Sequence, residues 1–289
     1  MKKDNEGNND KLYIRETLQL LPENENKVLN LNELNINDKF GIEALLGFHK
    51  VNLSHLYFYH YNCESVNDLN WGCAWRSMQS VLKFQLSLSN QNKDKDISFY
   101  NLFMKYGSKD KLLEIFMKMK EGQDYSKALN SLLDKKFAPF ETKYGWAEPF
   151  ISQLILYDFG FEGELILING YSSHNYTPKE VFNRTLNFKE FKELLKTHFM
   201  QNNPGPIIVD DSYISVSIFG VKFNEVNNNV ELLILDPHAS VKPICGVYII
   251  VLNDFGDFVE IIPNQHVLAS QSIAFNQYKF WTAYIPKSK

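Results

Sequence analysis

The sequence predicts an α+β domain in which helices come first and a largely antiparallel sheet follows. Two observations lead to this fold class. Between Cys73 and Met200 apolar residues recur mainly at helical spacing, whereas short apolar segments of strand composition follow one another after Pro204. Helices and strands that are grouped rather than alternating are typical of α+β domains and argue against a doubly wound sheet.

Length and charge limit the function classes. The chain has 289 residues, 44% of them hydrophobic, which is enough for one large domain or two small ones. Its net charge is −4, and no lysine- and arginine-rich run offers the basic face that nucleic acid or an anionic membrane surface requires. The N-terminal residues lack the apolar region of a signal peptide, and no later apolar run is long enough to span a bilayer. We therefore expect the protein to be located in the cytoplasm, with the nucleus as a further location.

Composition also predicts where the folded domain begins. Residues 1–40 are polar and rich in asparagine, which predicts a partly disordered N-terminal extension before a catalytic domain at 41–289. Early in that domain, the alternation over Leu53–Tyr61 predicts a strand that leads toward Cys73.

Apolar spacing predicts helices that start at Cys73, over 112–117, over 128–133 and over 150–155, where Gly160 ends the last one. A capping-box sequence at Thr177–Glu180 predicts the start of a further helix that reaches Met200. Six strands are then predicted near 207–209, 214–223, 230–235, 246–252, 259–262 and 280–285, with a hairpin turn at Asn227–Asn229.

Cys73 is the first candidate for chemistry. It follows Gly72 and opens the predicted helix, and the unpaired N–H groups of a helix N-terminus favour a thiolate over a thiol. We expect Gly72 to allow a sharp turn and to keep bulk away from the sulfur, and Asp68 or Asn70 to cap the helix. A small buried hydrophobic side chain is the alternative role for this cysteine.

Asp236 and His238 form the second candidate group. They follow an apolar strand, and residues two apart on an extended chain point to the same side. Pro237 prevents a helix and favours extended geometry for Asp236. An imidazole can accept a thiol proton, and a neighbouring carboxylate can hold its tautomer, so Cys73, His238 and Asp236 together match a nucleophile, a base and an orienting group. An exposed Asp-Pro turn beside a surface histidine is the alternative.

The remaining thiols suggest neither a disulfide framework nor a metal site. Cys63 and Cys245 are scattered, no CxxC or HxxxH pair has zinc spacing, and we expect both cysteines to be structural. We expect no cofactor and no metal. Arg76 and Gln79 follow the nucleophile on its helix, where we expect structural hydrogen bonds, although Gln79 could reach the site.

Two segments carry a family resemblance: residues 71–79, which read WGCAWRSMQ, and residues 233–238, which read LILDPH. Together they resemble the papain-like cysteine proteases specific for the ubiquitin-fold modifier. The resemblance implies a papain-like fold, with the nucleophile at a helix N-terminus packed against the sheet. It implies that Cys73 is the nucleophile, that His238 is the general base and that Asp236 orients it. Tyr61, twelve residues before Cys73, matches the family's oxyanion tyrosine.

The same resemblance implies the reaction and the partner. The expected activity is hydrolysis after the C-terminal glycine of a ubiquitin-like modifier, which matures its precursor and releases it from lysine side chains. The autophagy-related cysteine proteases share the two motifs, so processing of the autophagy modifier is an alternative, followed by a ubiquitin-chain protease of the same fold. A binding module that recognises such a modifier without cutting it is a rival of another class.

The chain departs from the family pattern beside the expected substrate groove. Residues 209–213 read VDDSY where the family has a glycine-rich run, and Ala239-Ser240 replaces an aromatic residue and a glycine. Only small residues let a modifier tail pass through a narrow groove, so these differences bear on which modifier fits.

Overall fold

The computed structural model describes residues 28–34, 36–40, 45–69, 71–89, 95–119, 149–168, 181–210, 214–238, 246–262 and 282–287. Several predicted features lie outside these ranges: residues 1–27, Asn70, the helix at 128–133, the capping box at 177–180, residues 211–213, Ala239-Ser240 and Cys245. In the described part of the chain, no helix is long and apolar enough to cross a membrane.

The described strands form one large sheet and one small one. In spatial order, the main strands of the large sheet are β10 (Phe258–Ile262), β9 (Val247–Leu252), β8 (Val230–Leu235), β7 (Ser215–Phe223), β6 (Ile207–Asp210), β11 (Thr282–Pro286), β4 (Gly163–Ile168) and β5 (Arg184–Leu186). The short strand β2 (His49–Lys50) also pairs with β7. Every pairing is antiparallel except that between β4 and β5. The small sheet joins β1 (Leu29–Asn30) to β3 (Tyr57–Phe58).

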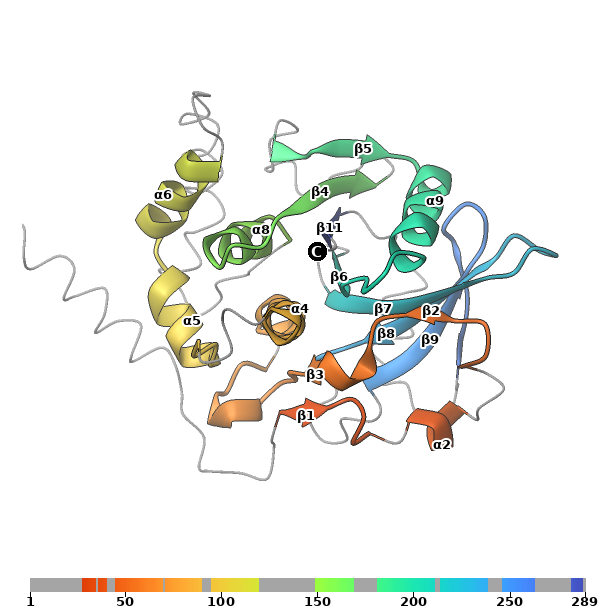
Figure 1. Ribbon diagram of the computed structural model, residues 1–289, viewed down its shortest axis with the longest axis horizontal. Helices are drawn as coiled ribbons and strands as arrows, with labels where there is room; N and C mark the ends of the chain where they lie inside the picture. The colour runs from red at the N-terminus through yellow and green to blue at the C-terminus, as the bar shows by residue number, and fades with distance from the viewer. Residues whose placement is uncertain are drawn as a thin grey trace, which may run out of the picture.

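The helices lie around this sheet (Figure 1). They are α2 (Ile36–Phe40), α4 (Cys73–Leu88), α5 (Phe99–Tyr106), α6 (Lys109–Met119), α8 (Pro149–Asp158) and α9 (Phe188–Phe199), with two 3-10 turns, η1 (Leu53–His55) and η2 (Cys63–Ser65). Helices therefore precede most of a largely antiparallel sheet, and the predicted α+β class is confirmed.

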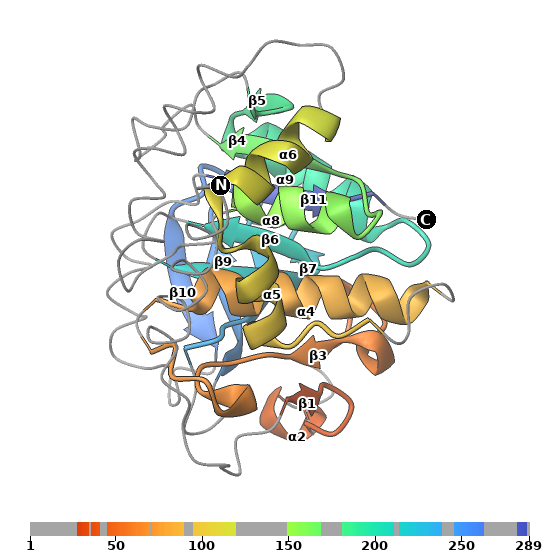
Figure 2. The same cartoon turned by 90° about the vertical axis from the view of Figure 1, so that its left-hand side faces the viewer.

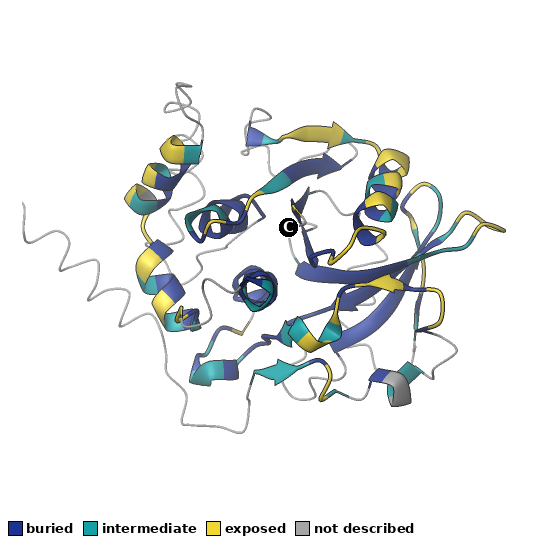
Figure 3. Cartoon of the chain, viewed as in Figure 1, coloured by how far each residue is buried: buried dark blue, intermediate teal, exposed yellow. Residues whose placement is uncertain are grey.

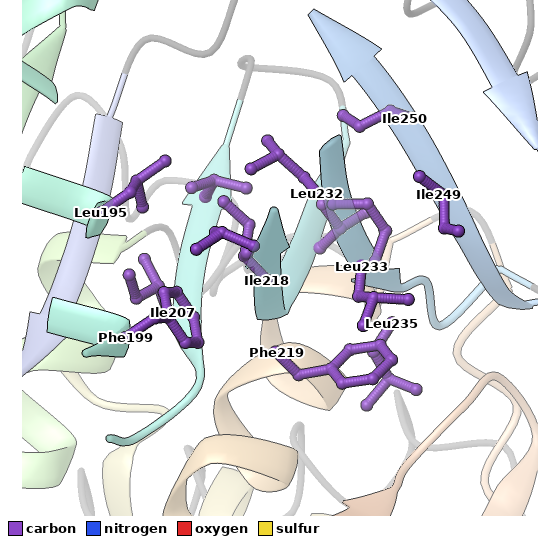
Figure 4. Packing of buried hydrophobic residues seen from close by; sticks show 14 of the residues in the cluster. Leu195, Phe199, Ile207, Ile218, Phe219, Leu232, Leu233, Leu235, Ile249 and Ile250 are labelled. Carbon is purple, nitrogen blue, oxygen red and sulfur yellow. The ribbon is translucent and has the colours of Figure 1, made fainter. Parts of the chain in front are cut away.

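Neighbouring residues of the sheet face two different cores. Ile207 packs in one core with α9, while Ile208 packs in the other with α4, α5, α6 and α8, because successive side chains of a strand point to opposite faces. Figure 4 shows Leu195 and Phe199 of α9 beside Ile207 of β6 in the first core.

Helix α4 lies at the centre of the molecule. It is seen end-on in Figure 1 and lengthwise in Figure 2, and it packs against β6, β7, α5 and α8. Every residue from Cys73 to Leu86 except Lys83 is buried, and the helix is almost uniformly dark in Figure 3. A helix enclosed on all sides holds its first residue in a fixed place, so its packing positions Cys73.

Two predicted elements are wrong in their bounds. Leu53–Tyr61 is not one strand, because η1 takes its first three residues and only Tyr57–Phe58 pairs with another strand. The helix that reaches Phe199 begins at Phe188, and Arg184–Leu186 before it forms β5. Asn187 and Glu190 provide a reciprocal capping box at that helix start, which explains why the helix begins there.

The other predicted helix starts and strands are close to those observed. α4 begins at Cys73, α6 and α8 contain the predicted apolar positions, and Gly160 follows α8 with a left-handed φ of 86°. The six predicted late strands are β6 to β11, and Asn228, with a φ of 57°, lies in the turn between β7 and β8.

Candidate active site

The four predicted site residues come together from three separate parts of the chain. Cys73 is the first residue of α4, Tyr61 precedes η2, and Asp236 and His238 follow the end of β8. Cys73, Tyr61 and Asp236 have exposed fractions of 1%, 2% and 0%, and the His238 side chain is 21% exposed. The imidazole is therefore the most exposed of these side chains.

Asp236 and His238 form a pair oriented as a base and its positioning carboxylate. Asp236 Oδ1 lies 2.5 Å from His238 Nδ1 and also accepts a hydrogen bond from the His238 backbone N–H at 2.9 Å. Because Nδ1 is used in this pair, Nε2 is the ring nitrogen left for chemistry. Burial opposes a charged imidazole, but Asp236 and Cys73 outweigh it and raise the pKa of His238 well above its ordinary value.

The sheet holds this pair in place. Asp236 donates its backbone N–H to the carbonyl of Gly246 at 2.7 Å, which continues the pairing of β8 with β9 by one residue. Tyr248 of β9 donates its hydroxyl to Asp236 Oδ2 at 2.8 Å. Both carboxylate oxygens are thus occupied, one by the imidazole and one by the phenol.

Sequence reasoning missed Tyr248. It is paired with Ile234, two residues before Asp236 on the same face of β8, so Tyr248 and Asp236 are diagonal neighbours across two strands. That relation follows from strand register, and a single sequence does not reveal which residues of two strands lie opposite each other.

Tyr61 lies against both reactive side chains. Its ring is 4.9 Å from the His238 ring, centroid to centroid, with an interplanar angle of 75°, and its backbone N–H donates to the carbonyl of Pro237 at 2.9 Å. Burial and the neighbouring Cys73 raise the pKa of Tyr61, so its hydroxyl keeps its proton. That hydroxyl is buried next to the Cys73 thiol and has no other hydrogen-bond partner among the described residues. Because a thiol is a weak acceptor, this donor is available for an oxygen of the substrate.

The start of α4 differs from the expectation in two ways. The residue before Cys73 in the cap position is Gly72, which has an ordinary φ of −83°, and no side chain of a described residue caps the helix. Asp68 is not a cap; its carboxylate binds Asn62 N–H and Arg76 Nε instead.

The lack of space beside Gly72 explains why this position has a glycine. A Cβ atom on Gly72 would lie 2.3 Å from Asp68 Oδ2. The glycine is therefore needed for its small size against Asp68, and its ordinary φ shows that no left-handed turn requires it.

The other side chains singled out by the sequence are structural. Gln79 does not reach the thiol; it bonds Arg76, Glu64 and the carbonyl of Ile97. Cys63 is fully buried, and burial raises the pKa of its thiol to about 12, so it stays protonated. Within the described ranges, no three His, Cys, Asp or Glu side chains are grouped as a metal site requires.

Chemically, the arrangement combines a thiol, an imidazole with a raised pKa, a carboxylate that fixes the tautomer, and a free phenolic donor. These are the parts that thiol-dependent acyl transfer uses: a nucleophile, a proton carrier and a donor for the oxygen that becomes negatively charged.

Comparison with known proteins finds relatives that are named Ufm1-specific proteases. The chain is 25% identical over 182 residues to Ufm1-specific protease 2 of Rattus norvegicus, which covers 63% of this chain and 31% of the relative. It is 26% identical over 183 residues to Ufm1-specific protease of Caenorhabditis briggsae, covering 63% of this chain and 24% of that protein. The chain thus spans less than a third of the length of these relatives. No family model matches the sequence.

The fold has a counterpart among solved structures. The crystal structure of UfSP from C. elegans superposes with a TM-score of 0.52 and 16% sequence identity, covering 92% of this chain and 38% of that chain. The predicted papain-like fold, with the nucleophile at a helix N-terminus beside a largely antiparallel sheet, is confirmed.

Proposed function

Because this chain is related in sequence to the Ufm1-specific proteases and shares the fold of UfSP, we propose that it is a cysteine protease acting on a ubiquitin-like modifier. It cleaves after the C-terminal glycine of the modifier, both in the precursor and in conjugates with lysine. The names of these relatives favour the ubiquitin-fold modifier over the autophagy modifier as the substrate of this chain. We place the reaction in the cytoplasm, where thiols are kept reduced.

The observation that carries the proposal is the convergence of Cys73, His238, Asp236 and Tyr61 on one buried spot. His238 takes the proton of the Cys73 thiol, and the sulfur attacks the carbonyl carbon of the terminal glycine. A carbon–sulfur bond forms, and the carbon–nitrogen bond to the leaving amine breaks as His238 returns the proton to that nitrogen. Water then attacks the thioester, again with His238 as the base, and releases the modifier carboxylate and the free thiol.

Tyr61 serves the oxygen rather than the sulfur. As the carbonyl carbon becomes tetrahedral, its oxygen gains negative charge, and a protonated phenol within reach can donate to it. The raised pKa of Tyr61 keeps that proton in place, and within the described ranges the hydroxyl has no neighbour for hydrogen bonding other than the Cys73 thiol. Removing one such donor typically costs about 10²-fold to 10³-fold in kcat.

The test uses modifiers that carry an electrophile in place of the C-terminal carboxylate. Probes made from the ubiquitin-fold modifier, the autophagy modifier and ubiquitin are incubated with the protein, and peptide mapping locates any adduct. We expect an adduct with the first probe, on Cys73 and not on Cys63, that Cys73→Ala abolishes. A preferred adduct with another probe would replace the modifier named here. Tight binding with neither adduct nor turnover would mean a binding module instead of an enzyme.

A further inference from the structure

The short segment after Tyr61 has an unusual backbone. Three of the residues in the turn, Asn62, Glu64 and Ser65, have left-handed φ values of 61°, 61° and 58°. Residues other than glycine rarely adopt this conformation, because their Cβ atom then lies close to the following carbonyl oxygen. Such a turn persists only where its surroundings impose it. Something outside the turn therefore holds the chain directly after Tyr61.

Arg76 supplies that hold from helix α4. Its Nη2 donates to the carbonyl of Cys63 at 2.9 Å, and its Nη1 lies 2.6 Å from Glu64 Oε2. The same oxygen of Glu64 accepts hydrogen bonds from Gln79 Nε2 and from the backbone N–H of Phe99. One guanidinium thus binds both the backbone and a side chain of the turn.

Asp68 connects the same turn to the start of the helix. Its Oδ1 accepts the backbone N–H of Asn62 at 2.8 Å, and its Oδ2 lies 2.6 Å from Arg76 Nε. Its own carbonyl accepts the backbone N–H of Gly72 at 2.9 Å, and its carboxylate fills the space beside that glycine. Asp68 therefore contacts the residue after Tyr61 and the residue before Cys73.

Stability alone does not account for this group. Asp68 and Arg76 have fully buried side chains, and Glu64 is 20% exposed at its side chain. Buried ion pairs often add little net stability, because desolvation offsets much of their attraction. What the planar guanidinium provides is fixed geometry, since its N–H groups bind Asp68, Glu64, Gln79 and the carbonyl of Cys63 in set directions at once.

We propose that the buried network of Asp68, Arg76 and Glu64 is a positioning device that sets where the Tyr61 hydroxyl lies relative to the Cys73 sulfur. Arg76 is one helical turn after Cys73, and its backbone N–H donates to Gly72. Arg76 therefore connects the segment that follows Tyr61 to the helix turn that begins with Cys73. The inference rests on the proposed function, because it assigns the network to the transition state of that reaction.

A double-mutant cycle tests the inference. The kcat and KM for cleavage of a modifier–lysine isopeptide are measured for the unmodified chain, Arg76→Lys, Tyr61→Phe and the double variant. Lysine keeps the positive charge but cannot make the set of hydrogen bonds that the planar guanidinium makes. We expect Arg76→Lys to lower kcat about tenfold, with KM nearly unchanged, when Tyr61 is present. In the Tyr61→Phe background we expect less than about a twofold loss, since no positioned hydroxyl remains to be displaced.

Other variants separate this role from a structural one. Glu64→Gln removes one charge at constant size and replaces Arg76→Lys if the latter does not fold; we expect about a threefold loss that also disappears in Tyr61→Phe. Asp158→Asn is the matched control, because it removes an ion pair with Lys105 and a hydrogen bond from Tyr106 away from the site, and it should leave kcat unchanged in both backgrounds. Equal losses with and without Tyr61, in a chain that is active, would overturn the inference alone. A chain without turnover or adduct would overturn the proposed function, and this inference with it.

Discussion

The two sides of the candidate active site are built in different ways. On the base side, Asp236 directly follows a strand that is paired on both edges, and its carboxylate accepts the hydroxyl of Tyr248. On the nucleophile side, no described residue caps the helix start with its side chain, and the turn after Tyr61 depends on the buried charges of Asp68 and Arg76.

This difference has a consequence for tolerance to substitution. Backbone pairing on the base side remains when one side chain is changed, so the Asp236–His238 segment keeps its place. On the nucleophile side the side chains of Asp68 and Arg76 join the turn to α4, and breaking one partner of a buried ion pair leaves the other charge uncompensated. We therefore expect the base side to tolerate changes in supporting residues better than the nucleophile side.

The largest loss of kcat is expected for Asp236, because on the base side this residue takes part in the proposed reaction itself. Asp236→Asn leaves the strand intact but no longer stabilises the His238 imidazolium or fixes its tautomer. We expect kcat to fall about 10³-fold to 10⁴-fold. Single-turnover cleavage of a modifier–lysine isopeptide measures the loss. Activity within tenfold of the unmodified chain would remove Asp236 from the mechanism.

Gly72→Ala tests the nucleophile side. The added methyl would lie 2.3 Å from Asp68 Oδ2, and Asp68 cannot swing away without losing Asn62 and Arg76. We expect about 2 kcal/mol of lost stability from overpacking and roughly a 10²-fold lower kcat from displacement of the site, measured by denaturant unfolding and steady-state kinetics.

Gly160→Ala is the control for this substitution. Gly160 has a φ of 86°, and apart from its chain neighbours no described residue has an atom within 4 Å of the added methyl, so that variant should lose about 1 kcal/mol from backbone strain alone and keep its kcat. Equal kinetic losses in the two variants would show that Gly72 matters only for stability.

Tyr248→Phe tests how far the base side tolerates a missing support. The change removes the hydrogen bond to Asp236 Oδ2 and leaves the backbone pairing in place. We expect about a tenfold lower kcat and a shift in the pH dependence of kcat/KM, because the charge of Asp236 is then shared with one partner fewer.

Tyr284→Phe provides the matched control. Its hydroxyl is buried and has no hydrogen-bond partner in the described part of the chain, so its loss should not change kcat. If Tyr248→Phe lowered kcat as much as Gly72→Ala, the contrast between the two sides would be wrong.

The smallest effect concerns pH and the charge on His238. Asp236 raises the pKa of His238 in the folded protein. The protonated His238 therefore adds to the free energy of unfolding, and this contribution is fully present below the unfolded pKa near 6.5. That contribution is lost as the pH rises toward and through the folded pKa, by at most about 1.4 kcal/mol per pH unit.

Urea unfolding between pH 6 and pH 10 checks this prediction in a Cys73→Ala background, which removes titration of the thiol. The stability difference between that protein and its His238→Gln derivative should decline as the pH rises. A difference that is constant over this range would mean that the pKa of His238 is not raised by Asp236.

Sequence alone was sufficient wherever a short-range rule governs the chain. Helical apolar spacing gave the start of α4 at Cys73, and alternation and turn residues gave β6 to β11. The i and i+2 geometry around Pro237 predicted that Asp236 and His238 share a side, and they form a pair with Nδ1 and Oδ1 2.5 Å apart. Local backbone preference and side-chain period act over a few residues, so they can be read without knowing what packs against them.

Tertiary structure decided the supports of the site. The sequence offered Asp68 as a helix cap, but packing against Arg76 and Asn62 gave it another role, and it made Gly72 necessary for reasons of space. Tyr248 reaches Asp236 only through the register of β8 and β9. Long-range contacts of this kind depend on which surfaces meet when the chain folds, and no pattern within either segment specifies the other. The candidate reactive residues could therefore be predicted from the sequence, while the groups that hold them became visible only in three dimensions.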